Sequence, residues 1–133
     1  MPTIQKFEDL EIWQLARTLY QKVSVIAQFL KEKKEFRFAE QIKSAAGSVM
    51  DNIAEGFERS SRLEFINTLS ISKGECAEVK SQLYRCLDDK YISEEKFMEL
   101  YNECDILMKK ISGFINYLNK SQYKGLKFKE RQP

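Results

Sequence analysis

The most informative absence in this sequence is histidine, which occurs at none of the 133 positions. A chain without histidine can form neither a Ser-His nor a Cys-His nucleophile pair. It also lacks the Glu-x-x-His motif with which ferritin-like helical bundles hold a pair of metal ions. No glycine-rich phosphate-binding loop is present either, since the 5 glycines of the chain lie far apart. We therefore predict that the protein is not an enzyme and has no cofactor, no catalytic residue and no metal ligand.

Proline is almost as rare, because only Pro2 and Pro133 occur and both lie at the ends of the sequence. An interior proline removes a backbone donor and breaks a helix, so its absence favours long helices over many short strands. Apolar residues make up 43% of the chain, an ordinary share for a globular protein. The length fits one domain that can bury a core without a disulfide or a structural metal.

Cysteine is limited to Cys76, Cys86 and Cys104, and no two of them have the spacing of metal ligands. An odd number of cysteines within helical patterns indicates reduced thiols in an intracellular protein. The N-terminus does not resemble a signal peptide, and no apolar run approaches the length that crosses a membrane. We expect a cytoplasmic location and no membrane partner.

Apolar residues recur at spacings of three and four in four successive segments, which is the pattern of amphipathic helices. We expect these helices over about residues 8–31, 35–56, 61–88 and 93–118. Ser61 and Ser93 are predicted N-caps, and Gly56 is predicted to end the second helix. Because short connections make neighbouring helices antiparallel, the predicted fold is an all-α, antiparallel up-down-up-down four-helix bundle over residues 1–119.

The apolar stripes predict which side chains form the core of this bundle. The first stripe contains Ile12, Ala16, Leu19, Val23, Ile26 and Leu30. The second contains Ala39, Ile42, Ala46, Val49 and Ile53. The third includes a lysine and consists of Ile66, Leu69, Lys73, Cys76, Val79, Leu83 and Leu87. The fourth is the longest and runs through Phe97, Leu100, Tyr101, Cys104, Leu107, Met108, Ile111, Phe114, Ile115 and Leu118.

A polar stripe lies beside the apolar one in the second segment. Its residues are spaced four, three and four, and they are Ser48, Asn52, Glu55 and Arg59. One interpretation is a polar network between helices or subunits, and the other is a solvent-exposed face that Gly56 simply ends. Gly47 and Gly74 are expected in helix interiors, where glycine costs about 1 kcal/mol relative to alanine. Such glycines often mark a close approach of two backbones.

One pair of carboxylates has the spacing of a metal site. Glu75 and Glu78 share a helix face, and Asn102 and Asp105 have the same spacing on the next helix. This arrangement resembles the magnesium site of all-helical nucleotide pyrophosphohydrolases, which use four carboxylates. Asn102 cannot supply the charge of the third carboxylate. A pyrophosphohydrolase is therefore only a remote alternative, and a solvated helix face is the simpler interpretation.

Positive charge is concentrated at the C-terminus. Residues 120–133 contain five basic side chains and one acidic side chain, a net charge of +4. Since the whole chain carries +2, the remaining residues carry −2. We expect residues 120–133 to form a flexible tail. Aromatic residues among its lysines can grip single-stranded nucleic acid, and a disordered solubilising end is the alternative.

Four stretches of the sequence resemble a known family, the four-helix-bundle proteins encoded within intervening sequences of bacterial 23S ribosomal RNA genes. The similarity runs through residues 7–118 in order. It is carried by Phe7 to Ala16, by Gln41 to Ala46, by Asn52 to Gly56 with Arg59, and by Gly74 with Glu78. The stretch from Asn52 to Arg59 is the most specific of the four.

This resemblance implies a ring of antiparallel four-helix bundles, commonly a pentamer, and an association with RNA. Accessory proteins of diversity-generating retroelements share the fold and bind nucleic acid and a reverse transcriptase. No enzymatic activity is established for the family. The resemblance adds Glu78 to the candidate oligomer or inter-helix network, which then consists of Ser48, Asn52, Glu55, Arg59 and Glu78.

The sequence departs from the family where positive charge is expected. Lys43 and Ser44 stand in place of paired arginines, and Gly74 is followed by Glu75 instead of serine. Because phosphate binding depends on positive charge, RNA contact is expected mainly at the tail. The candidate nucleic-acid-binding residues are Lys43, Lys120, Lys124, Lys127, Lys129 and Arg131. The leading hypothesis is a non-enzymatic homo-oligomer associated with RNA or a nucleic-acid-processing protein, and the alternative is a protein-interaction scaffold without RNA.

Overall fold

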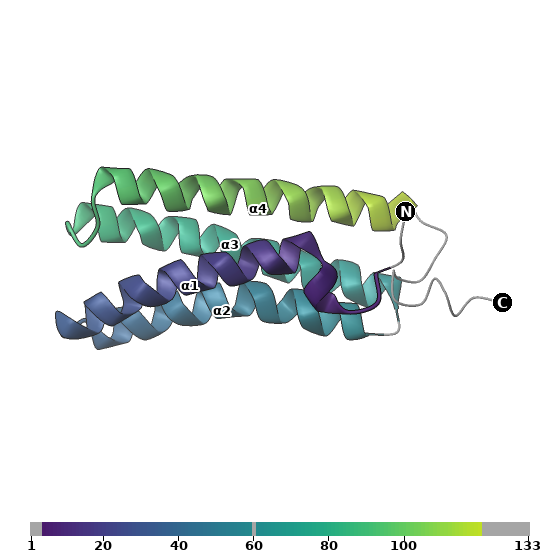
Figure 1. The fold of residues 1–133 in the computed structure, drawn as a ribbon, viewed down its shortest axis with the longest axis horizontal. Coiled ribbons are helices and arrows are strands. Elements are labelled where there is room, and N and C mark those ends of the chain that lie inside the picture. The colour runs from purple at the N-terminus through teal and green to yellow at the C-terminus, as the bar shows by residue number, and fades with distance from the viewer. Residues whose placement is uncertain (1–3, 60, 121–133) are drawn as a thin grey trace.

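The computed structural model describes residues 4–59 and 61–120 of the chain. A short 3-10 helix, η1 (Phe7–Asp9), precedes four long helices, which are α1 (Glu11–Glu32), α2 (Phe36–Glu58), α3 (Arg62–Asp88) and α4 (Glu94–Lys120). The described residues contain no strand. The four helices lie side by side along one long axis (Figure 1). The predicted all-α four-helix bundle is therefore confirmed.

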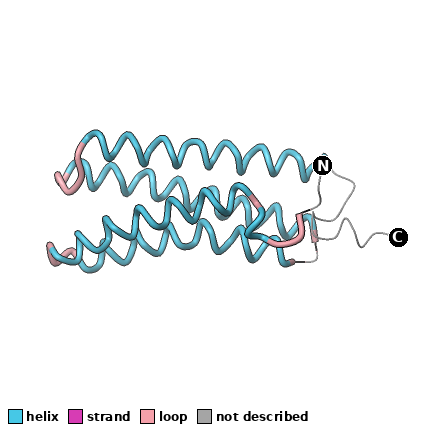
Figure 2. Tube along the Cα trace, in the orientation of Figure 1, coloured by secondary structure: helices cyan, strands magenta, loops and turns pink. Residues whose placement is uncertain are grey.

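Successive helices run in opposite directions, and the connections between them lie at the ends of the bundle (Figure 2). The turns that join α1 to α2 and α3 to α4 share one end (Figure 1). The start of α1 and the end of α4 lie at the other end. The predicted domain boundary at residue 119 falls beside Lys120, the last residue of α4, and the rest of the predicted tail lies outside the described residues.

The two predicted serine N-caps are confirmed. Ser61 Oγ accepts hydrogen bonds from the backbone N–H groups of Leu63 (3.1 Å) and Glu64 (3.3 Å). Ser93 Oγ accepts one from the N–H of Lys96 (3.0 Å). These bonds satisfy donors that the first turn of a helix leaves unpaired, so they fix where α3 and α4 begin.

The helices α1 and α3 end in the same kind of turn. Lys34 and Lys90 have left-handed backbones, with φ of 65° and 63°. The following N–H groups reach back across the turn, from Glu35 to the Leu30 carbonyl and from Tyr91 to the Cys86 carbonyl, both at 2.8 Å. This is the Schellman arrangement, which usually places glycine at the left-handed position. The sequence signal for these two helix ends was therefore weak.

Two predicted helix bounds are wrong. The first helix begins at Glu11 and not near residue 8, because Leu10 is extended and separates it from η1. The second helix does not end at Gly56 but continues to Glu58. Gly56 has no left-handed φ. A Cβ atom placed on it would lie 1.8 Å from Thr68 Oγ1 and 2.8 Å from Phe65 Cδ1. The glycine is thus required by the close approach of α3.

The buried side chains form one core between the four helices. The predicted stripes of α1 and α2 are fully buried. In α4, six members of the stripe are buried and the other four pack partly buried against the core. All three cysteines are buried and free, and burial raises the pKa of the Cys86 thiol to about 11. None of the described helices combines the length and the apolar character needed to cross a membrane.

The predicted stripe of α3 departs from the buried face at three positions. Phe65 is buried in place of Ile66 and Cys86 in place of Leu87, and both replaced residues are half-buried. Ser72 is buried in place of Lys73, which remains partly exposed. The serine can enter the core because its hydroxyl donates to the Val49 carbonyl at 2.6 Å. A buried lysine would instead need a charged partner.

Candidate interaction surfaces

The polar stripe of α2 divides into two parts in the structure. Asn52 Nδ2 donates to the backbone carbonyl of Ser48 at 2.8 Å, so its amide bonds within its own helix. Arg59 joins two carboxylates at the α2–α3 connection. Its Nη2 donates to Glu55 Oε1 at 3.2 Å, and its Nη1 to Glu64 Oε1 at 3.4 Å. The side chains of all three are about half-exposed.

This Glu55–Arg59–Glu64 cluster is the place where the predicted polar residues connect two helices. Exposed ion pairs of this kind contribute about 0–1 kcal/mol each, because water screens them. The cluster therefore adds little to the stability of the α2–α3 contact, and its charged groups remain accessible to solvent. Glu64 was not among the candidate residues, because its separation of 5 residues from Arg59 matches no helical pairing pattern.

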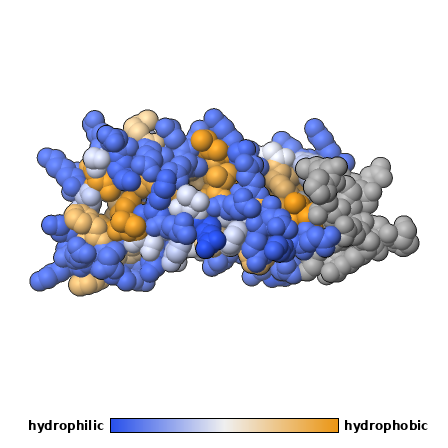
Figure 3. Space-filling model, viewed as in Figure 1, coloured by the Kyte–Doolittle hydropathy of each residue, from blue (hydrophilic) through white to orange (hydrophobic). Residues whose placement is uncertain are grey.

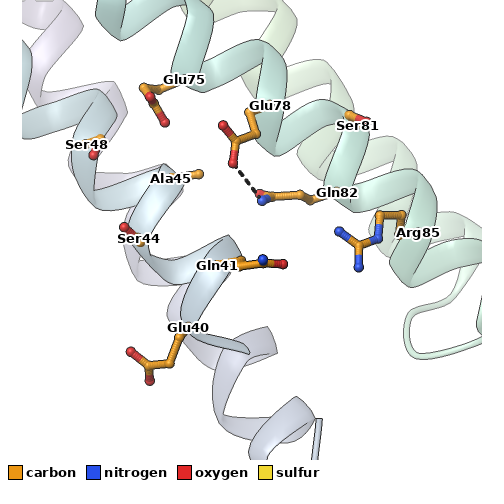
Figure 4. A pocket seen from close by; sticks show the side chains of 10 residues that line it. All are labelled: Glu40, Gln41, Ser44, Ala45, Ser48, Glu75, Glu78, Ser81, Gln82 and Arg85. Atoms are coloured by element: carbon orange, nitrogen blue, oxygen red, sulfur yellow. Dashed lines mark hydrogen bonds between the residues drawn. The ribbon is translucent and has the colours of Figure 1, made fainter. Parts of the chain in front are cut away.

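The other two candidates, Ser48 and Glu78, lie together in a groove between α2 and α3 (Figure 4). The groove has a volume of about 580 Å³. Side chains from both helices face one another across it (Figure 4). The predicted network is thus distributed over two places, the α2–α3 connection and this groove.

The carboxylates of the alternative magnesium site do not converge. Glu75 and Glu78 line the groove beside α2. Asp105 on α4 instead pairs with Lys109 at 3.0 Å and with Lys80 at 3.5 Å. Lys109, with a smaller effect from Lys80, holds the pKa of Asp105 below its ordinary value. In residues 4–59 and 61–120, no three His, Cys, Asp or Glu side chains gather in a way that could hold a metal ion.

Only two of the candidate nucleic-acid-binding residues can be placed. Lys43 lies beside a second hollow, between α1 and α2, together with Tyr20, Glu40 and Asp51. Two of these neighbours are acidic, which is unfavourable for a phosphate. Lys120 is exposed at the end of α4. The other candidates lie outside the described residues, and they are Lys124, Lys127, Lys129 and Arg131.

The two glycines singled out in the sequence have no close backbone neighbour among the residues that the structure describes. A Cβ atom on Gly47 would make only ordinary contact with the ring of Tyr20, at 3.6 Å. A Cβ atom on Gly74 would meet nothing within 4 Å. The close approach expected at Gly74 is therefore not made by any described part of this chain, and Gly56 makes one instead.

The ion pairs between α1 and α4 were not predicted from the sequence. Lys22 on α1 donates to Glu99 at 2.9 Å and also pairs with Glu103, both on α4. The hydrogen bonds to Glu103 and Glu99 raise the pKa of Lys22, and the bond from Lys22 lowers that of Glu99. Lys110 pairs with Glu11 at 3.2 Å. No local pattern predicts these pairs, since their members lie 77 to 99 residues apart.

The model of the 23S rRNA-intervening sequence protein family matches residues 8–113. The chain belongs to this family. The match begins in η1 and extends through most of α4, so it includes the polar stripe of α2 and the groove. The family resemblance drawn from the sequence motifs is confirmed. The basic residues 120–133 lie beyond the family match.

Among solved structures, this family member is similar to a crystal structure from Bacteroides thetaiotaomicron, of a protein of unknown function from the S23 ribosomal protein family. The two share 27% sequence identity with a TM-score of 0.74. The likeness covers 78% of this chain and 97% of the other. None of the curated proteins matches this chain.

Apolar side chains are exposed on every helix of this family member. They are Val25, Phe29, Phe36, Leu63, Ile71, Tyr84, Met98, Ile106 and Tyr117. On the face shown in Figure 3, separate apolar patches interrupt a mostly hydrophilic surface. Single exposed apolar residues are common in proteins, so only those combined with another unusual feature are informative.

Proposed function

We propose that this family member is a non-enzymatic module that assembles with copies of itself and contacts RNA or a ribonucleoprotein. Self-assembly is supported by a feature of the outer face of α3, and a ring, with the pentamer as the expected form, is what the family resemblance implies. The RNA contact has its support in the family and in the charge of residues 120–133.

The observation that carries self-assembly is the outer face of α3. Ser70, Gly74 and Ala77 are exposed and lie along one side of this 27-residue helix, beside Ile71, which is 52% exposed. A glycine inside an exposed helix is less stable than alanine by about 0.5–1 kcal/mol. Small side chains allow another backbone to approach closely. The approach of a second copy would account for Gly74, which no contact with residues 4–59 or 61–120 explains.

The mass of the full-length chain in solution, measured by light scattering, tests this assembly. The native mass should be a multiple of 15.7 kDa. Ala77→Arg should lower the mass, because a long charged side chain would hold a second backbone away from Gly74. Gln28→Arg, which adds the same charge at an exposed position of α1, is the matched control. A native mass of one chain at every concentration would refute self-assembly.

The polar cluster at the α2–α3 connection supports a second assembly test. Arg59→Glu would place a third carboxylate beside Glu55 and Glu64. We expect the repulsion to change the assembly state if the cluster belongs to a subunit contact. An unchanged mass would limit the subunit contact to other surfaces.

RNA binding is proposed for residues 120–133, because the rest of the chain carries a net charge of −2. A gel-shift titration with the full-length chain should show an RNA affinity that falls as salt rises. Deletion of residues 121–133 should weaken it most, while Lys43→Gln should have little effect among its acidic neighbours. Absence of RNA binding at low salt would remove this half of the proposal.

The alternative is a scaffold that contacts only proteins, and the near-neutral charge of the bundle favours it. Such a scaffold would assemble without regard to RNA. Copurification from the native cell, with both protein and RNA identified, separates the two functions. A protein partner that still copurifies after ribonuclease treatment supports the scaffold function. Loss of the partner on ribonuclease treatment supports the ribonucleoprotein function.

A further inference from the structure

The groove between α2 and α3 has the size and the polar side chains of a small binding site. Its volume of about 580 Å³ lies in the range of small-molecule pockets. Gln41, Ser44 and Ser48 line it from α2. Glu75, Glu78 and Gln82 line it from α3, and Figure 4 shows these side chains directed toward α2.

Gln82 is the buried member of this groove, since only 5% of it is exposed. Its Nε2 donates to Glu78 Oε2 at 3.0 Å (Figure 4). Its Oε1 is buried and accepts no hydrogen bond from any of the residues that the structure describes. Buried polar atoms without a partner are rare in folded proteins. The floor of the groove therefore lacks a hydrogen-bond donor.

The two carboxylates beside Gln82 lack a cation. Neither Glu75 nor Glu78 forms an ion pair with a described residue. Burial, and then the neighbouring charge of Glu78, raises the pKa of Glu75. Both causes act in the same direction, because burial and a neighbouring negative charge each disfavour the ionised form of Glu75.

One basic side chain, Arg85, lines the groove, and a second, Lys31, lies at its rim. Lys31 pairs with Glu40 at the rim, at 3.1 Å. The guanidinium carbon of Arg85 lies 4.0 Å from the centre of the Phe38 ring, a cation–π contact. The groove thus combines Glu75 and Glu78, which have no ion pair with a described residue, with an unpaired buried acceptor on Gln82. Neutral polar groups and the guanidinium of Arg85 complete its lining.

We propose that this groove binds an alkylammonium or guanidinium group, whose charge pairs with Glu75 and Glu78 and whose N–H groups supply the donor that Gln82 Oε1 lacks. The amide and hydroxyl oxygens of Gln41, Ser44 and Ser48 can accept further N–H groups. A linear polyamine or a basic side chain carries both the positive charge and the N–H donors. Amine binding goes beyond the proposed function. It is measured separately, so its test is independent of the tests for self-assembly and RNA binding.

Two sources can provide such a group, a free polyamine or the basic C-terminal residues of this chain. The 13 residues after Lys120 can span up to about 43 Å when extended. The end of α4 lies level with the start of α3 (Figure 1). The groove residues of α3 lie no more than about 35 Å along that helix. Residues 121–133 are therefore long enough to reach the groove.

Calorimetric titration of the full-length chain with spermidine at low ionic strength tests the site. We expect saturable binding of one spermidine per chain. Glu75→Gln with Glu78→Gln should weaken it about tenfold, because the bound cation then loses both carboxylates. Glu94→Gln with Glu95→Gln makes the same change of charge at exposed positions of α4 and should alter the affinity by less than about twofold.

A second variant tests the buried amide. Gln82→Met keeps the length of the side chain and removes both the acceptor and the donor to Glu78. It should weaken spermidine binding severalfold without lowering the thermal unfolding temperature. Unchanged affinity in Gln82→Met would remove the amide from the proposed contact.

Neutralising the basic tail distinguishes the two sources. The variant changes Lys124, Lys127, Lys129 and Arg131 to glutamine. If the tail occupies the groove, spermidine should bind this variant more tightly than it binds the native chain. If a free polyamine is the occupant, spermidine should bind the variant and the native chain equally. The proposal is overturned if neither chain shows saturable binding, or if the two glutamate double variants weaken binding equally.

Discussion

The seam between α2 and α3 and the seam between α1 and α4 are held together by different means. In the first, the helices approach so closely that Gly56 has no room for a Cβ atom beside Thr68. A buried hydrogen bond from Ser72 to the Val49 carbonyl crosses the same seam at 2.6 Å. Short side chains therefore fix the distance between these two helices.

The seam between α1 and α4 is crossed by long charged side chains. Lys22 reaches Glu99 and Glu103, and Lys110 reaches Glu11. These groups are 27–66% exposed, so water screens their attraction. Long side chains can also adjust their rotamers when a neighbour changes. The comparison indicates that the α2–α3 seam should be intolerant of small changes and the α1–α4 seam tolerant of larger ones.

The largest effect is expected for Gly56→Ala. The added methyl group would overlap Thr68 and the Phe65 ring, and such overpacking lowers the free energy of unfolding by about 1–3 kcal/mol. Urea unfolding followed by circular dichroism measures the change. Thr68→Ala in the Gly56→Ala background should recover part of the loss. Equal stability of Gly56→Ala and the native chain would show that the seam is not closely packed.

Ser72→Ala should have the next largest effect. It removes the buried donor to the Val49 carbonyl, and the loss is expected to be about 1–2 kcal/mol of unfolding free energy. The control is Ser70→Ala, two residues away on the exposed side of the same helix. Urea midpoints of the two variants should differ by this amount, and identical midpoints would contradict a structural role for the Ser72 bond.

Gly113→Ala makes the same substitution as Gly56→Ala, but at a position with space around it. A Cβ atom there would meet nothing within 4 Å, so only the gain in helix stability remains. The unfolding free energy should rise by about 0.5–1 kcal/mol. Opposite signs for Gly56→Ala and Gly113→Ala, measured in one urea series, would separate the effect of the seam from that of helix propensity.

Lys22→Met should have the smallest effect at neutral pH, and that effect should depend on salt and pH. The pKa of Glu99 is lowered by Lys22, so the pair stabilises the fold above the ordinary glutamate value of about 4.5 and loses its effect as the pH falls below it. The pKa of Lys22 is raised, so the effect is also lost above about pH 10.5. Thermal unfolding at pH 7 and pH 3, with and without 1 M salt, would reveal the difference; a salt-independent loss would contradict the screened pair.

Most of the fold was predictable because its signals are local. The spacing of apolar residues marked four helices, and the two serine caps act within three residues of their partners. The helix end assigned to Gly56 failed because the same residue type serves both helix termination and close packing. The α3 stripe failed at Ser72 because its partner, Val49, lies 23 residues away.

The candidate sites were predictable only as lists of residues. Spacing placed Ser48, Asn52, Glu55 and Arg59 on one helix, but it did not show that Ser48 and Glu78 line the same groove. It also did not mark Gln82, which the sequence offered as an ordinary polar residue. Burial next to α2 is what leaves its Oε1 without a partner among the described residues.

By itself, the sequence determined the helices of this protein, the starts of α3 and α4, and the family to which the chain belongs. Helical hydrogen bonds and caps join residues no more than four positions apart, so they are written in short patterns. Only the tertiary structure decided which seam is closely packed, which is crossed by ion pairs, and where a groove is left between α2 and α3. Those features depend on the distances between helices, and such distances are set by side chains that meet from distant parts of the chain.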